Sequence, residues 1–200
     1  MPFTPPSTPD EALARLLAGN RRFVNEQPRA PIPSAARLEL ASAQRPFAAI
    51  LGCSDSRVPV ETIFDQQPGD LFVVRLAGNI ATSEALGSIE YAVEVLGCML
   101  VVVLGHSSCG AVQAAMALVE SDVTPPGHIA LLAEAIAPAA RAARAAGGDW
   151  WGKAVETNVR ASTGRITGRS AIVRAAATRG GLRVTGALYD LPTGLVTLLG

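Results

Sequence analysis

Short apolar runs alternate with segments of helical periodicity along most of the chain, and this alternation predicts an α/β fold. The runs are rich in branched residues and lack polar residues at every second position. That pattern is typical of strands in a parallel sheet that helices cover on both faces. The predicted strands lie at 47–51, 71–76, 100–104, 182–188 and 195–199.

Helical spacing occupies the segments before and between these runs. The first helix is expected to begin at Asp10, whose side chain is a favourable cap. Pro138 is expected to kink or divide a long alanine-rich helix, and Gly164 and Gly168 predict interruptions in the last helical region. The predicted helical segments are 10–23, a short piece ending at 43 after the proline-rich linker 27–34, a short helix after residue 59, 83–96, 110–120, a stretch from after residue 127 to about 146, and 150–178 in pieces.

The order of these elements predicts a single domain, residues 1–200, with a mainly parallel central sheet. Strands separated by helices pair in parallel, whereas 195–199 follows its neighbour after a short turn and is expected to be antiparallel. The sheet would contain four parallel strands and a short antiparallel edge strand, flanked by helices. Residues 1–43 are expected to form an N-terminal helical arm on an α/β core of residues 44–200.

Composition and charge exclude several classes of partner. Seventeen acidic and seventeen basic side chains cancel, which leaves no basic surface of the kind that binds nucleic acid or membranes. The longest apolar run is well short of the roughly 18 residues of a spanning helix, and the proline-rich start does not resemble a signal peptide. We therefore expect a cytoplasmic protein whose three cysteines are free thiols or metal ligands.

Candidate metal ligands follow two of the predicted strands. His106 and Cys109 follow the central run, where Gly105 is expected to end the strand, and Cys53 follows the first run. Because parallel strands end at the same edge of a sheet, the three side chains can meet there. Two thiolates and one imidazole suit zinc, and three protein ligands leave a fourth position open, as in catalytic sites. One zinc ion per chain is therefore expected.

Two charged residues lie in the turn after Cys53. Asp55 and Arg57 are spaced for a bidentate pair that would hold the carboxylate beside the metal, but Asp55 could also bind the metal itself. Each candidate taken alone has a simpler interpretation, because cysteine is often a small buried hydrophobe and histidine can cap backbone groups. Cys98 has no other candidate ligand near it in the sequence and is assigned to core packing. His128 is assigned to a helix start or the surface.

The two motifs resemble the zinc site of the β-class carbonic anhydrases, which is built from Cys-x-Asp-x-Arg and His-x-x-Cys. The resemblance implies that Cys53, His106 and Cys109 bind Zn²⁺ and that Asp55 and Arg57 orient the attacking hydroxide. It covers most of residues 10–199 through further matching segments, which are Pro-Gly-Asp-Leu-Phe-Val-Val-Arg at 68–75, Ala-Gly-Asn at 77–79, Gly-Ser-Ile-Glu-Tyr-Ala-Val at 87–93, Asn-Val-Arg at 158–160 and Gly-Ala-Leu-Tyr-Asp at 186–190.

The resemblance also implies substrate contacts and a partner. Gln44, nine residues before Cys53, matches the glutamine that hydrogen-bonds bicarbonate. Phe72 and Tyr91 match aromatic residues that line the substrate pocket. In this family parts of the pocket come from the dimer partner, so a homodimer or a dimer of dimers is expected.

A few positions distinguish two styles of site within this family. In one style the aspartate closes onto the zinc, and a tryptophan three residues before the first cysteine helps form a regulatory bicarbonate site. Here that position is Ile50, which together with Gln44 favours the open style, although Arg75 matches a regulatory-site position. Leu76 is a further departure, because the family commonly has asparagine there.

The expected reaction is the reversible hydration of carbon dioxide to bicarbonate and a proton by attack of zinc-bound hydroxide. The same site could instead hydrolyse carbon disulfide or carbonyl sulfide, which are also linear and apolar. Outside enzymes, the alternative is a non-catalytic zinc-binding scaffold or sensor. The sequence offers no evident histidine for proton transfer, because His106 is already used as a ligand.

Overall fold

Five strands form one sheet in the computed structural model, which describes residues 5–32 and 34–200. The strands lie in the order β2-β1-β3-β4-β5, and all are parallel except β5, which is antiparallel to β4. The prediction of four parallel strands with a short antiparallel edge strand is confirmed. The strands are β1 (Ala48–Gly52), β2 (Leu71–Arg75), β3 (Leu100–His106), β4 (Arg183–Tyr189) and β5 (Val196–Leu199).

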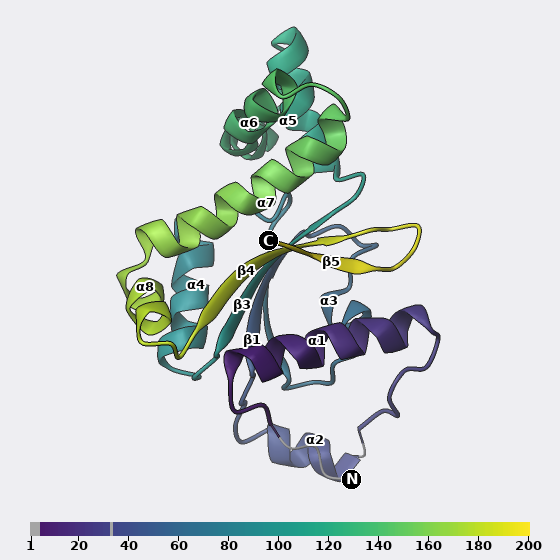
Figure 1. Cartoon of the computed structure of the whole chain (residues 1–200), viewed down its shortest axis with the longest axis vertical. Helices are drawn as coiled ribbons and strands as arrows, with labels where there is room; N and C mark the ends of the chain where they lie inside the picture. Colours follow the sequence, from purple (N-terminus) through teal and green to yellow (C-terminus); the bar gives the residue numbers. More distant parts are fainter. Residues whose placement is uncertain (1–4, 33) are drawn as a thin grey trace.

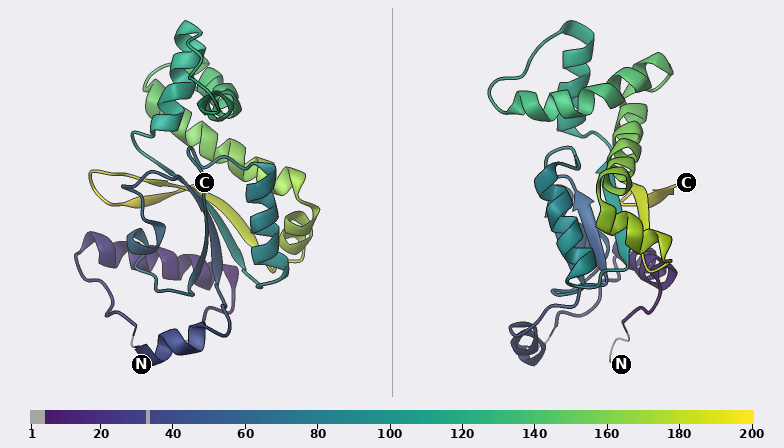
Figure 2. Two further views of the ribbon diagram at one scale, coloured as in Figure 1. Left: turned by 180° about the vertical axis from the view of Figure 1, so that it is seen from behind. Right: turned by 90° about the vertical axis from the view of Figure 1, so that its left-hand side faces the viewer.

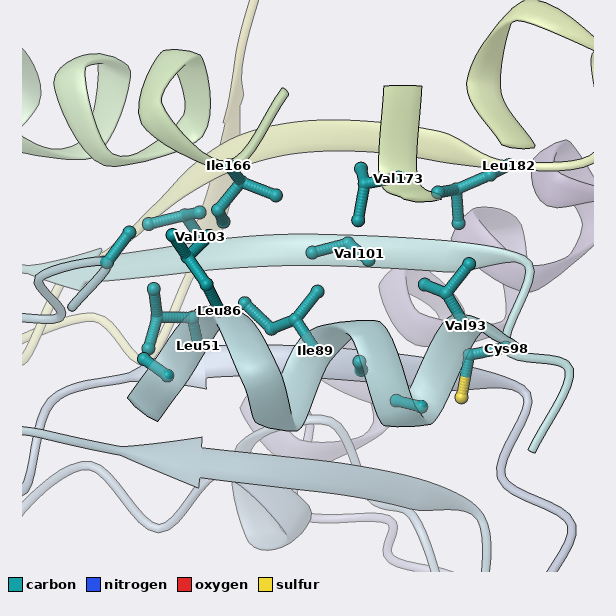
Figure 3. Packing of buried hydrophobic residues seen from close by; sticks show 14 of the residues in the cluster. Leu51, Leu86, Ile89, Val93, Cys98, Val101, Val103, Ile166, Val173 and Leu182 are labelled. Carbon is teal, nitrogen blue, oxygen red and sulfur yellow. The ribbon is translucent and has the colours of Figure 1, made fainter. Parts of the chain in front are cut away.

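Helices cover both faces of this sheet (Figures 1 and 2). One face carries α4 (Ser83–Glu94), α7 (Trp150–Arg169) and α8 (Ala171–Thr178), and the other carries α1 (Pro9–Val24) and α3 (Val60–Ile63). Figure 3 shows the first core, where side chains of α4 and α7 meet those of the central strands. Because β1 and β3 lie between the two layers, all their residues are buried, as unbroken apolar runs predict.

A further pair of helices projects beyond the carboxyl ends of the strands, at the top of Figure 1. These helices, α5 (Gly110–Ser121) and α6 (Ile129–Ala145), pack on each other and on the first turns of α7. Their alanine-rich faces form an apolar cluster that also contains Cys53 and Cys109. Small side chains let the helices pack closely over the strand ends where the candidate ligands lie.

The short helix α2 (Ser34–Leu40) lies at the opposite end of the molecule, near the amino ends of the strands (Figure 1). Its Leu38 is 77% exposed. None of the described helices is long and apolar enough to cross a membrane.

The central strand β3 continues past its expected end. Gly105 and the residue after it both pair with β4, so the prediction that Gly105 ends the strand is wrong. A Cβ at Gly105 would lie 2.4 Å from Cγ2 of Val159 on α7, and one at Gly186 on β4 would lie 2.7 Å from Cγ1 of the same valine. The two glycines form a notch that lets α7 approach the sheet. The turn instead falls at Ser108, whose φ is +57°.

Three helix predictions also need correction. Thr8, and not Asp10, caps α1, because the Thr8 hydroxyl accepts a backbone N–H of the first turn while Asp10 lies within that turn. Pro138 lies inside α6 and does not divide it, and a kink there stays a prediction. α7 is one continuous helix through Gly164 and Gly168, since both face solvent and neither has to accommodate a neighbour.

Candidate metal centre

The turn after β1 presents the first candidate ligand at the carboxyl edge of the sheet. Cys53 directly follows β1 and is 4% exposed. The backbone N–H of Gly78 donates to its Sγ over 3.3 Å. Arg75, at the end of the neighbouring β2, donates to the carbonyl oxygens of Cys53 (2.9 Å) and Asp55 (2.6 Å). The side chain of Arg75 therefore fixes the turn that carries both residues.

The end of β3 presents the other two candidate ligands. His106 is the last residue of β3 and is fully buried, and Cys109 is the residue that precedes α5. His106 Nδ1 lies 2.9 Å from the carbonyl oxygen of Ser107. A carbonyl oxygen only accepts hydrogen bonds, so Nδ1 carries the proton and Nε2 presents a lone pair. The tautomer is therefore the one that binds a metal through Nε2.

The three candidate ligands converge. The Sγ atoms of Cys53 and Cys109 and a ring nitrogen of His106 all lie within 4.8 Å of one another. His106 Nε2 is buried and has no hydrogen-bond partner, which is costly for a polar atom unless something else binds it. The orphaned nitrogen and the two thiols thus form a donor set of the kind that holds a divalent metal.

The two thiols share one negative charge. Hydrogen bonds from Cys109 and from the Gly78 N–H lower the pKa of Cys53 to about 4, against the opposing effect of burial. The pKa of Cys109 is raised, first by its hydrogen bond to Cys53 and then by burial, although N–H groups at the start of α5 oppose this. One thiolate is thus present at neutral pH, and metal binding must release the other proton.

Asp55 and Arg57 form the predicted bidentate pair. Arg57 donates from Nε to Oδ1 of Asp55 over 3.0 Å and from Nη2 to Oδ2 over 2.8 Å, and its backbone N–H adds a third bond. Arg57 lowers the pKa of the Asp55 carboxyl from 3.8 to about 2, so it is ionised at neutral pH. Oδ2 lies 3.9 Å from His106 Nε2. The carboxylate therefore lies beside the three candidate ligands while Arg57 holds it.

The predicted substrate residues do not join this cluster within one chain. Gln44 is exposed and precedes the amino end of β1, whereas the cluster lies at the carboxyl end. Five residues of strand rise about 16 Å, so the two positions are well separated. Phe72 lies near the start of β2, and its ring centroid is 6.1 Å from that of Tyr91 on α4. Their roles in substrate binding stay predictions.

Four other residues discussed in the sequence analysis are not among the three candidate ligands. Cys98 is buried against the core and burial raises its pKa to about 12, which fits its assignment to packing. His128 is exposed and precedes the first residue of α6. Ile50 is fully buried in the core on the α1 face, and Leu76 packs against the α5–α6 cluster.

The structure adds one residue to the surroundings of the site. Asn158 on α7 donates to the carbonyl oxygen of Gly78 over 2.8 Å, and Gly78 in turn contacts Cys53. The sequence contains Asn158 and Gly78 in family-like segments, but no spacing rule connects residues 80 positions apart. The available signal is the spacing of Asn158, which shares a predicted helix face with the apolar Ala154, Val155 and Val159.

Comparisons with known proteins agree with this arrangement. The family model described as carbonic anhydrase matches residues 48–196. The chain is 41% identical over 195 residues to carbonic anhydrase 2 of Mycobacterium tuberculosis, which covers 97% of this chain and 94% of that protein. It is 40% identical over 195 residues to carbonic anhydrase of Mycolicibacterium smegmatis, with coverage of 97% and 95%.

Solved structures indicate which class of carbonic anhydrase the fold resembles. The fold is similar to that of a tetrameric β-carbonic anhydrase of Sordaria macrospora, with a TM-score of 0.73 and 31% identity over 82% of this chain and 85% of that one. A Coccomyxa β-carbonic anhydrase in complex with acetazolamide matches with a TM-score of 0.72 and 32% identity, covering 94% and 86%. The chain therefore belongs to the β-class carbonic anhydrase family.

Proposed function

We propose that this carbonic anhydrase binds one zinc ion through Cys53, His106 and Cys109 and uses it for the reversible hydration of carbon dioxide to bicarbonate and a proton. The observation that carries the proposal is the convergence of the three donor atoms within 4.8 Å, with His106 Nε2 buried and unpartnered. Two sulfur donors and one imidazole suit zinc better than harder cations. Three protein donors match the number in catalytic zinc sites.

The metal would supply a nucleophile at neutral pH, because zinc lowers the pKa of a bound water from 15.7 to about 7. The chain's own residues would hold and orient the reactants. Asp55 is ionised and held by Arg57, so its Oδ2 is an acceptor next to His106 Nε2. We assign Asp55 the role of accepting a hydrogen bond from the attacking nucleophile, which directs the nucleophile's lone pair towards carbon dioxide.

The pair with Arg57 also favours the open style of site. Arg57 donates three hydrogen bonds to the Asp55 carboxylate and thereby holds its orientation, although Oδ2 keeps a lone pair for one further donor. Such charge-assisted, bidentate bonds are among the strong ones in proteins. We therefore propose that Asp55 stands beside the zinc at neutral pH and that the fourth position remains available to the reactants.

A second copy of the chain would complete the substrate pocket. Gln44, Phe72 and Tyr91 lie towards the amino ends of the strands, away from the cluster of their own chain. Tyr91 is 47% exposed on α4, and β2 is an edge strand with a half-exposed apolar surface. We propose a homodimer, or a dimer of dimers, in which Gln44 donates to bicarbonate and the two aromatic rings line the pocket of the partner. Light scattering that shows a fully active monomer would contradict this.

Stopped-flow hydration of carbon dioxide, run beside metal analysis, tests the function. We expect one zinc per chain and rapid hydration in the parent protein, and neither in Cys109→Ser. Cys98→Ala is the matched control, because it removes a buried cysteine outside the site and should retain both zinc and activity. Full activity in metal-free protein or in Cys109→Ser would contradict the proposal.

Two other outcomes would redirect the proposal. Turnover of carbon disulfide or carbonyl sulfide that exceeds carbon dioxide hydration in a parallel assay would identify a different substrate for the same site. Zinc retention without hydration above background would identify a scaffold or sensor. A cytoplasmic location stays a prediction, in keeping with three free cysteines.

A further inference from the structure

Two consecutive hydrogen bonds connect α7 to the sulfur of Cys53. Asn158 Nδ2 donates to the carbonyl oxygen of Gly78 over 2.8 Å, and the backbone N–H of Gly78 donates to Cys53 Sγ over 3.3 Å. Asn158 is only 3% exposed, and Ala154 and Val155, one turn earlier on α7, belong to the apolar cluster with α5 and α6. A buried amide at this place has to be satisfied by specific partners, and its donor is aimed at a single backbone carbonyl.

The conformation of Gly78 explains why that carbonyl needs an anchor. Gly78 has a φ of +76°, which glycine adopts readily and other residues do not. A Cβ there would lie 2.5 Å from Ile136 on α6 and 3.1 Å from Ala111 on α5. Gly78 thus lies in close contact with two helices but has no side chain to limit its own backbone torsions. The carbonyl held by Asn158 and the N–H that meets Cys53 lie on either side of the same Cα.

We propose that Asn158 is a positioning residue for the metal centre: by anchoring the Gly78 carbonyl it fixes the direction of the Gly78 N–H and so controls the donor strength of the Cys53 sulfur. An N–H donor draws electron density from a thiolate. It also holds Sγ in place before metal arrives. Groups that hydrogen-bond to metal ligands commonly orient those ligands and tune their donor strength. Loss of such a group typically costs 10–100-fold in metal affinity or activity. The inference rests on the metal binding proposed above.

A purely structural role for Asn158 predicts something different. If the amide only satisfied a buried carbonyl, its loss would lower stability and leave the metal unaffected. Asn20 on α1 offers the matched comparison, because it is also 3% exposed and donates from Nδ2 to two backbone carbonyls, at 3.2 Å and 2.8 Å. It lies on α1, on the other face of the sheet, and its hydrogen bonds go to Ile63, Gly194 and Val196, none of which is a candidate ligand. Asn20→Asp should therefore reproduce the structural cost alone.

The test uses Co²⁺ as a spectroscopic probe and a chelator competition for zinc, in parent protein, Asn158→Asp, Asn158→Ser and Asn20→Asp. We expect the sulfur-to-cobalt charge-transfer band to move to longer wavelength in both Asn158 variants, because a sulfur without the aligned N–H gives up electron density more easily. Zinc affinity should nevertheless fall by about 10–100-fold, because Sγ is no longer held in place before the metal arrives. Asn20→Asp should match the parent in both measurements. Asn158→Ser introduces no charge, and it therefore provides the test if the buried carboxylate of Asn158→Asp prevents folding.

Three results would overturn the inference. The Asn158 variants could keep the parent's band and affinity, the control could change as much as they do, or affinity could fall without a band shift, which would indicate general loosening. A parent protein that takes up neither Co²⁺ nor zinc would instead overturn the proposed function, so the two failures are distinguishable.

Discussion

Replacing Gly105 with alanine should destabilise the protein and disturb the metal centre, although the residue lies in a regular strand. Its backbone needs no unusual torsion, so a Gly→Ala change in a strand would ordinarily be expected to stabilise the folded protein by about 0.5–1 kcal/mol. The surroundings reverse that expectation. An added Cβ would lie 2.4 Å from Cγ2 of Val159 and 3.2 Å from Cδ2 of Leu188. The first separation is shorter than any relaxed contact, so something has to move.

The contact at Val159 cannot be relieved by a small rotation. Val159 is β-branched and lies within α7, where one χ1 rotamer is strongly preferred, so its γ-methyl does not readily turn away from the added Cβ. α7 itself would have to lift from the sheet. Overpacking of this kind costs about 1–3 kcal/mol. Because the next residue is His106, a displaced β3 end would also move the imidazole, and zinc affinity should fall together with stability.

Urea unfolding followed by circular dichroism measures the effect as a lower midpoint with an unchanged slope. Gly164→Ala in α7 is the matched control, because Gly164 is exposed and nothing lies within 4 Å of an added Cβ. It should stabilise the protein by about 0.5–1 kcal/mol. Adding Val159→Ala to Gly105→Ala should recover part of the loss, so the two changes should be non-additive. A Gly105→Ala protein as stable as the parent would refute the notch and the close helix approach it explains.

Three further predictions follow from the local geometry. Thr8→Ala should cost about 1 kcal/mol by removing the cap of α1, whereas Asp10→Ala should cost little because its ion pair is exposed; thermal or urea unfolding of the two variants separates them. Cys98, with a pKa of about 12, should resist iodoacetamide at pH 8 until the protein is unfolded, as mass spectrometry of the labelled peptides can show. Because Arg57 lowers the pKa of Asp55 from 3.8 to about 2, their pair stabilises the folded state fully above about pH 4 and ceases to do so as the pH falls towards 2. The difference in unfolding free energy between parent and Asp55→Asn should shrink over that range.

The sequence predicts much of this structure because the relevant physics is local. Each strand is an apolar run, and each candidate ligand directly follows a strand, so the parallel topology alone brings Cys53, His106 and Cys109 to one edge. Asp55 and Arg57 are two residues apart in one turn, and their pairing needs no distant element.

The features that the sequence does not predict depend on distant packing. The role of Gly105 is set by a helix that begins 45 positions later, and the pattern of residues 100–106 contains no trace of it. Asn158 reaches the site only through a loop between β2 and α4. Gln44 is separated from the cluster by the length of β1, because Gln44 precedes the amino end of this five-residue strand and Cys53 follows its carboxyl end.

X-ray absorption at the zinc edge counts the sulfur neighbours of the metal. We expect one zinc per chain with two sulfur neighbours at about 2.3 Å and two nitrogen or oxygen neighbours at about 2.0–2.1 Å, and no zinc signal from Cys109→Ser. Asp55→Asn should leave this coordination unchanged at neutral pH, because Asp55 is held by Arg57. Zinc with any number of sulfur neighbours other than two in the parent protein would contradict a Cys53–His106–Cys109 zinc site, and a spectrum that changes when Asp55 loses its charge would contradict a carboxylate that stands beside the metal.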